Sequence, residues 1–156
     1  MTTIADENDH SACVNAWMER REVKGLSPDR LLRAFEEAFA AMWRRAHLTL
    51  GDVTLTAIVD RVLHVASERY PALAPLEVDA TGLRGDGLRQ RAAGLQGRQL
   101  EAGVRFVLVE FLTVLGTLTG EILTPALHDE LSRVAVEAGR SSETRPERAD
   151  GGEAKS

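Results

Sequence analysis

Polar residues within the apolar segment Gly103–Leu123 are the first candidates for chemistry. At about 100° of rotation per helical residue, four of them fall close to one line: they are Glu110, Thr113, Thr117 and Glu121. Two carboxylates buried together would have raised pKa values and could act as a proton-handling pair or line a ligand cavity. The same line could also be the solvent-facing side of the helix or the seam of a dimer. The sequence leaves these interpretations open.

Small residues recur along one side of the same segment. They are Thr113, Gly116, Thr117 and Gly120. A glycine inside a helix costs about 1 kcal/mol relative to alanine, so two of them require a structural reason. Close approach of another helix is the natural one. That helix belongs either to the same chain or to a second copy in a symmetric homodimer.

A histidine followed by two acidic residues lies further along the chain, in the segment Leu127–Leu131. An imidazole beside a carboxylate can serve as an activated nucleophile. The segment resembles the phosphoacceptor box of one class of bacterial sensor histidine kinases, and the resemblance implies His128 as a phosphoacceptor. The ATP-binding boxes of those kinases are absent, which excludes autokinase activity. Histidine phosphotransfer through His128 therefore remains as an alternative function.

Other reactive residue types form no recognisable site. His64 and Glu68 are four residues apart, but two ligands do not make a zinc site. Cys13 is the single cysteine, which excludes an internal disulfide and fits a reducing compartment. No nucleophile elbow, phosphate-binding loop or dinucleotide fingerprint is present. We therefore expect a non-enzymatic protein with no cofactor and no metal.

An aromatic anchor for a partner protein is expected near the start of the chain. Residues 9–24 are sparsely apolar, and Trp17 and Met18 are their largest apolar side chains. They would form either a helix docked on the rest of the protein or an arm that folds against a partner. An aromatic side chain is the usual centre of such an interface, so Trp17 and Met18 are the predicted partner-binding residues.

The segment Gly103–Leu123 is predicted to be the central helix, because its apolar residues point in nearly all directions. It is too long for a buried strand. Arg105, Glu110 and Glu121 leave at most ten uncharged residues in a row, whereas a membrane span needs about 20. The protein is therefore expected to have no membrane partner.

Start and stop signals predict further helices around this one. A capping hydroxyl followed by proline predicts that a helix begins at Ser27 and Pro28, and its apolar stripe predicts an end near His47. After a break at Gly51, a second helix runs to Tyr70, where Pro71 ends it. A helix near Leu88 leads toward a break at Gly97, and a last helix begins at Thr124 and stops at Gly139.

The stretch between Pro71 and Gly87 has a different pattern. Prolines and glycines interrupt it, and residues 76–82 alternate between apolar and polar, which is the period of a half-exposed strand. Two interpretations are open. The segment is either an extended connector, which we favour, or a strand that pairs with its copy in a homodimer.

Composition completes the expectation. The chain has 156 residues, 44% of them hydrophobic and 28% charged, and a net charge of −5 without a basic cluster, which argues against a nucleic-acid partner. The first ten residues are too polar for a signal peptide.

We expect an all-α bundle of four to five helices, with a polar arm or short helix at 1–25, the bundle at 26–139 and a disordered tail at 140–156. The expected function is that of a cytoplasmic regulatory or adaptor protein, homodimeric and acting by protein–protein binding. The alternatives are phosphotransfer and small-ligand sensing.

Overall fold

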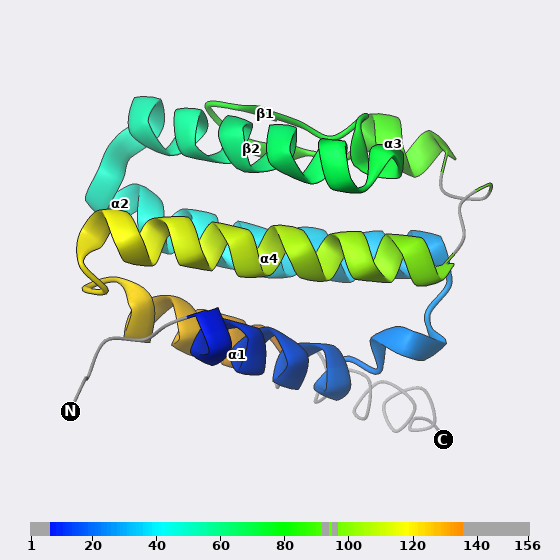
Figure 1. Ribbon diagram of the computed structural model, residues 1–156, viewed down its shortest axis with the longest axis horizontal. Helices are drawn as coiled ribbons and strands as arrows, with labels where there is room; N and C mark the ends of the chain where they lie inside the picture. Colours follow the sequence, from blue (N-terminus) through cyan, green and yellow to red (C-terminus); the bar gives the residue numbers. More distant parts are fainter. Residues whose placement is uncertain (1–6, 92–93, 95–96, 136–156) are drawn as a thin grey trace, which may run out of the picture.

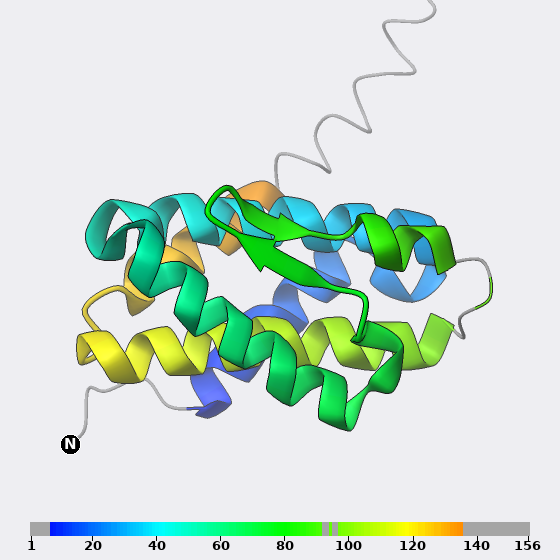
Figure 2. The ribbon, with the colours of Figure 1, turned by 90° about the horizontal axis from the view of Figure 1, so that it is seen from above.

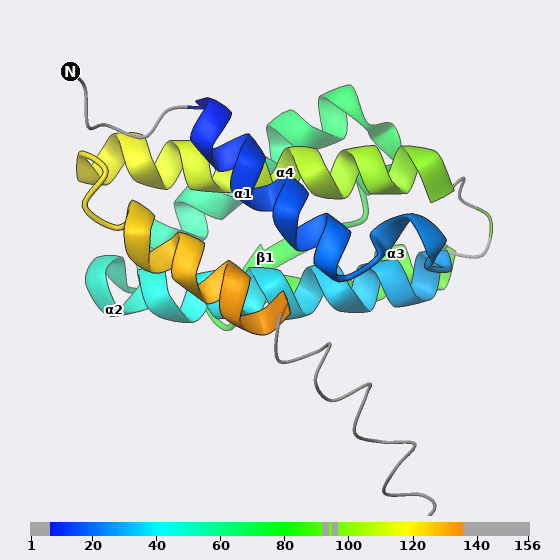
Figure 3. The ribbon, with the colours of Figure 1, turned by 90° about the horizontal axis from the view of Figure 1, so that it is seen from below.

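The computed structural model describes residues 7–91, 94 and 97–135. Helices make up 83% of it and pack against each other, so the all-α prediction is confirmed. Figures 1–3 show three layers of helices. The predicted stop at Gly139 and the predicted tail at 140–156 lie outside the described residues.

One long helix, α2 (Pro28–Arg69), supplies two of the layers. It begins as the sequence predicts, because the Ser27 hydroxyl accepts a hydrogen bond from the Arg30 N–H at 3.4 Å. At Gly51 the backbone leaves the helical region, with φ 80° and ψ 175°, and the chain turns back. The first arm, residues 28–50, is longer than predicted, because the residues after His47 continue the helix instead of bridging to the next. The second arm, residues 52–69, ends before Pro71.

The middle layer consists of this first arm and α4 (Gly97–Thr119), which lie side by side (Figure 2). The helix α4 begins six residues before its predicted start at Gly103 and stops before Leu123. Its 23 residues, with a mean hydropathy of 1.6 over an 18-residue window, would allow it to cross a membrane by length and composition alone. The core helices of soluble bundles pass the same test, and here buried residues run from Leu100 to Gly116.

The lower layer consists of α1 (Glu7–Arg20), followed by the short helix η1 (Val23–Gly25), and of the helix at residues 124–135, called helix 124–135 below. Both cross the face of the middle layer (Figure 3). Of the two interpretations of the first segment, the docked helix is the one observed. The helix already includes residues 7 and 8, which lie before the segment 9–24 in which it was expected.

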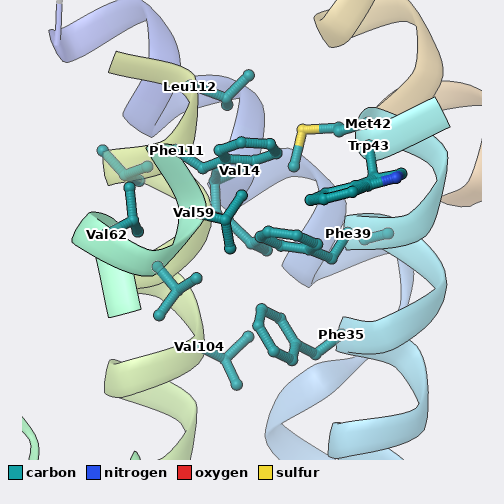
Figure 4. Close-up of a cluster of buried hydrophobic side chains, with 14 of the residues drawn as sticks. Val14, Phe35, Phe39, Met42, Trp43, Val59, Val62, Val104, Phe111 and Leu112 are labelled. Atoms are coloured by element: carbon teal, nitrogen blue, oxygen red, sulfur yellow. The ribbon is translucent and has the colours of Figure 1, made fainter. Parts of the chain in front are cut away.

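Aromatic and branched side chains from three helices form the centre of the core (Figure 4). The rings of Phe39 on α2 and Phe111 on α4 stack with 4.6 Å between their centroids, and both are fully buried. Val14 of α1 closes the cluster from the lower layer. The stripe on α2 is therefore core packing, as its spacing predicts.

A β-hairpin lies in the upper layer beside the second arm of α2 (Figure 2). Strand β1 (Glu77–Asp79) pairs antiparallel with β2 (Gly82–Arg84) of the same chain. Neither the connector nor pairing with a second copy was therefore correct. The two-residue loop is fixed because Asp79 accepts hydrogen bonds from the N–H and the hydroxyl of Thr81, and Gly82 takes φ 125°. The short helices η2 (Pro71–Leu73) and α3 (Asp86–Arg91) flank the hairpin.

Candidate functional site

The turn that ends α4 positions the first group of the site. Gly120 has φ 62°, its N–H bonds to the Thr117 carbonyl at 3.4 Å, and the Glu121 N–H bonds to the Gly116 carbonyl at 2.7 Å. These two bonds and the left-handed glycine form a Schellman motif, a common helix stop. Glu121 itself has φ 68°, so it lies outside the helix. The predicted line from Glu110 to Glu121 is therefore broken before its last member.

The side chain of Glu121 folds back onto α4. A β-carbon added at Gly116 would lie 2.7 and 3.0 Å from its two carboxylate oxygens. The Thr124 hydroxyl donates a hydrogen bond to Oε1 at 2.5 Å. Gly116 thus makes room for the carboxylate, whereas the sequence had predicted that it makes room for a neighbouring helix.

His10, in the first turns of α1, is the buried member of the site. His10 is only 1% exposed, and its Nε2 lies 3.9 Å from Oε1 of Glu121. Its Nδ1 lies 3.0 Å from Nε2 of His128, which is in helix 124–135. The two rings meet edge to face, with 5.2 Å between centroids and 89° between planes. These three side chains, Glu121, His10 and His128, are called the histidine cluster below.

His128 is half-buried, and its environment opposes a positive charge. Burial is the largest influence that lowers its pKa below the usual 6.5, and the neighbouring His10 lowers it further. The carboxylates of Asp9, Asp129 and Glu121 act in the opposite direction and are outweighed. At 3.0 Å the two facing nitrogens have room for one hydrogen between them, so one of the two must accept. The arrangement therefore favours a pair with at least one neutral ring.

In this geometry one nitrogen of His128 is already engaged. The Nε2 of His128 faces His10 and is engaged by it, whereas the phosphotransfer alternative requires an imidazole exposed on a bundle face. Among the described residues, no group of three or more histidine, cysteine, aspartate or glutamate side chains is placed to hold a metal ion. The chemistry that the cluster does offer is proton uptake at a buried contact between two helices.

Glu110 lies apart from Glu121. It lines a small hollow of about 230 Å³ together with Tyr70, Arg69 and Arg105. Glu121 is not among the residues that line it. The predicted pair of buried carboxylates therefore does not form a common site.

The remaining predicted seam residues have separate surroundings. The Thr113 hydroxyl donates to the Val109 carbonyl of its own helix at 2.8 Å. Thr117 and Gly120 are exposed. Two of the four predicted seam residues, Thr117 and Gly120, are thus accessible to a partner, and they lie at the end of α4.

The predicted partner-binding residues lie on α1. Trp17 is 2% exposed and belongs to the core, so its ring cannot anchor a partner in this conformation, and Met18 is half-buried against the core. Trp17 has few apolar neighbours in the sequence, but it lies with Val14 on the side of α1 that packs against the core.

Cys13, on the same helix, is half-buried. Burial, with a smaller contribution from the charge of Asp129, raises the pKa of its thiol to about 11.

Large exposed apolar side chains occur at two places in the described part of the chain. They flank the break of α2 and the end of α4: Leu48, Val53, Leu118 and Ile122, which are 77%, 84%, 60% and 80% exposed. The break and the helix end lie at the same end of the bundle in Figures 1–3. We call these four residues the apolar end. Nothing in the sequence pattern marked them.

A larger hollow, of about 500 Å³, lies between α2 and the hairpin. Trp43, Arg44, Arg84 and Arg89 are among its lining residues. Arg89 pairs with Glu36, and Arg84 pairs with Asp79 at 3.0 Å, so these two arginines are already neutralised by the protein. The hollow contains none of the predicted site residues.

Sequence reasoning missed His10, because the residue lies in the segment expected to be a polar arm or short helix and its partner is 118 positions away. Its place three residues before Cys13 and four before Val14, on the buried face of α1, was the available signal. Comparison of the chain with protein-family models, with curated proteins and with solved structures gives no match.

Proposed function

We propose that this chain is a small, non-catalytic regulatory protein of the cytoplasm that binds protein, and that it first pairs with a second copy of itself through the apolar end. The observation that supports this is the exposure of Leu48, Val53, Leu118 and Ile122 at one end of a bundle whose other large apolar residues, among those that the structure describes, are buried or half-buried. Exposed apolar residues that gather in one place are typical of interaction surfaces.

A second copy is the preferred occupant because the charges near the apolar end are of both signs. Asp52 pairs with His47 there, and Arg45 is exposed on the preceding turn. A two-fold interface places each surface against its own copy, so a surface with a single sign of charge would repel itself. The exposed Thr117 and Gly120 carry little bulk, which favours close approach of the two copies.

The alternatives receive less support. Phosphotransfer would need an exposed imidazole, whereas His128 is half-buried and its Nε2 contacts His10. Ligand sensing would need a cavity beside Glu110 and Glu121, and the hollow beside Glu110, at about 230 Å³, is below the roughly 300 Å³ at which small-molecule sites begin.

Sedimentation equilibrium of the full chain tests the proposal. We expect the wild type to be a dimer and the double variant Leu118→Lys, Ile122→Lys to associate at least about tenfold more weakly, since each lysine would place a charge in an apolar contact. Ala16→Lys, on an exposed part of α1, is the matched control and should leave association unchanged. A wild type that stays monomeric, or a double variant that dimerises equally well, would refute the proposal. Circular dichroism verifies that each variant is folded.

A further inference from the structure

The contact between His10 and His128 joins the first turns of α1 to helix 124–135. Three observations define it: the 3.0 Å separation of Nδ1 and Nε2, the 1% exposure of His10, and the 3.9 Å approach of Glu121 to the other nitrogen of His10. The contact needs an unprotonated nitrogen on one of the rings. It is therefore compatible with no more than one positive charge.

We propose that His10 and His128 form a proton-operated clasp, which holds the first turns of α1 against helix 124–135 while one ring is neutral and releases them when both are charged. The proposal stands apart from the proposed self-association, because none of the apolar-end residues is part of the clasp. It concerns residues 7–13 and not the whole helix.

The charged groups around the pair come from each element that meets there. Asp9 is on α1, Glu121 is in the turn after α4, and Asp129 is on helix 124–135; all three favour a charged His128. Asp9 and Asp129 are exposed, so water and salt weaken their influence. Burial and the facing His10 outweigh the three carboxylates. A second proton therefore meets net opposition in the closed state.

Release is expected to stay local because the rest of α1 has other anchors. Val14 and Trp17 are buried in the core, and the Arg105 side chain donates a hydrogen bond to Asn15 at 2.8 Å. His10 is the only described residue before Val14 that is fully buried. Charging the pair therefore removes the main attachment of the first turns and leaves the second half of the helix in place.

The single cysteine provides the readout, since Cys13 lies one turn after His10 and is half-buried. Its reaction with a pyridyl disulfide, which proceeds in acid, is followed from about pH 8 to pH 5. Each rate is divided by the rate of the urea-unfolded chain at the same pH, which cancels the intrinsic chemistry of the thiol. We expect the normalised rate to rise at least about tenfold as the open population grows.

Three variants decide the outcome. His128→Gln keeps a hydrogen-bonding group but cannot be charged, so its normalised rate should stay flat. His64→Gln, at an exposed histidine paired with Glu68, is the matched control and should behave as the wild type. Glu121→Gln removes an anion that favours the charged pair, so its transition should move to higher pH. A flat wild type, a rise in His128→Gln equal to that of the wild type, or a loss of helical circular dichroism at the same midpoint would overturn the proposal.

Discussion

The carboxylate of Glu121 occupies the space that a side chain on Gly116 would need. A β-carbon at position 116 would lie 2.7 Å from one of its oxygens and 3.0 Å from the other. The glycine and the acid are five residues apart and are also joined by the hydrogen bond between the Glu121 N–H and the Gly116 carbonyl. The helix stop and the position of the charge near His10 thus depend on the same pair of residues.

Replacing Gly116 by alanine should push this carboxylate away from the histidine cluster. Since Glu121 is one of the charges that raise the pKa of His128, we expect that pKa, already lowered by burial and by His10, to fall further. Stability should decrease by only about 1 kcal/mol, because alanine gains about 1 kcal/mol in a helix while the hydrogen bond from Thr124 is lost at a cost of about 1.5–3 kcal/mol. An NMR titration of His128 and urea unfolding measure the two effects.

Gly97→Ala is the control for this substitution, since nothing lies within 4 Å of a β-carbon at that position. It should leave the pKa of His128 unchanged. An unaltered pKa of His128 in Gly116→Ala would contradict the prediction.

Replacing Gly103 by alanine should destabilise the core. The added β-carbon would lie 2.8 Å from Cδ1 and 3.2 Å from Cγ of Leu73, which is 2% exposed. Overpacking of this kind costs about 1–3 kcal/mol. The double variant with Leu73→Ala should recover part of that loss, because the smaller side chain leaves room. A double-mutant cycle measured by chemical denaturation tests this coupling, and strictly additive effects would argue against it.

The turn in α2 depends on the backbone freedom of Gly51. Its φ of 80° and ψ of 175° are strained for other residues, although a β-carbon there would meet no atom within 4 Å. We expect Gly51→Ala to cost about 1–3 kcal/mol in the free energy of unfolding. Gly25→Ala, also in open space but without a positive φ, should change stability by less. Equal effects of the two substitutions would show that backbone strain at the turn is not the cause.

The histidine cluster should make the protein less stable in acid. Burial and the neighbouring His10 lower the pKa of His128 in the folded state below its usual 6.5, so the unfolded chain binds the proton more tightly. The stability that this group provides is therefore present above pH 6.5 and is lost as the pH falls below it. Urea unfolding at about pH 7.5 and about pH 5.5 measures the loss, which should be smaller in His128→Gln than in His64→Gln.

Local signals predicted most of the fold. Ser27 and Pro28 begin α2, Gly51 breaks it and Pro71 follows its end, because each acts on its neighbours through a hydroxyl, a backbone conformation or a ring. The end of α4 was predicted too late. Its periodicity continues through Gly120, and only the left-handed conformation of that glycine ends the helix. The hairpin was not predicted, because residues 76–82 alternate as one segment whereas the second strand begins at Gly82, which resembles a breaker.

The candidate site could be predicted only in part. Glu121 and His128 were singled out by residue type, Glu121 as the partner of Glu110 and His128 as a phosphoacceptor. The structure instead places both of them beside His10. His10 was missed because polarity near the start of the chain outweighs one buried position on a helix. A contact between residues 10 and 128 depends on how two helices that are distant in sequence pack against each other. The local sequence of each helix does not predict that packing.

The separation of His10 and His128 also has a consequence for synthesis. The two residues are 118 positions apart, so the first turns of α1 leave the ribosome long before the residue that holds them in place. Val14 and Trp17 can pack once α4 has emerged, whereas His10 gains its partner only with helix 124–135. The first turns of α1 are therefore among the last of the described parts of the protein to reach their final packing.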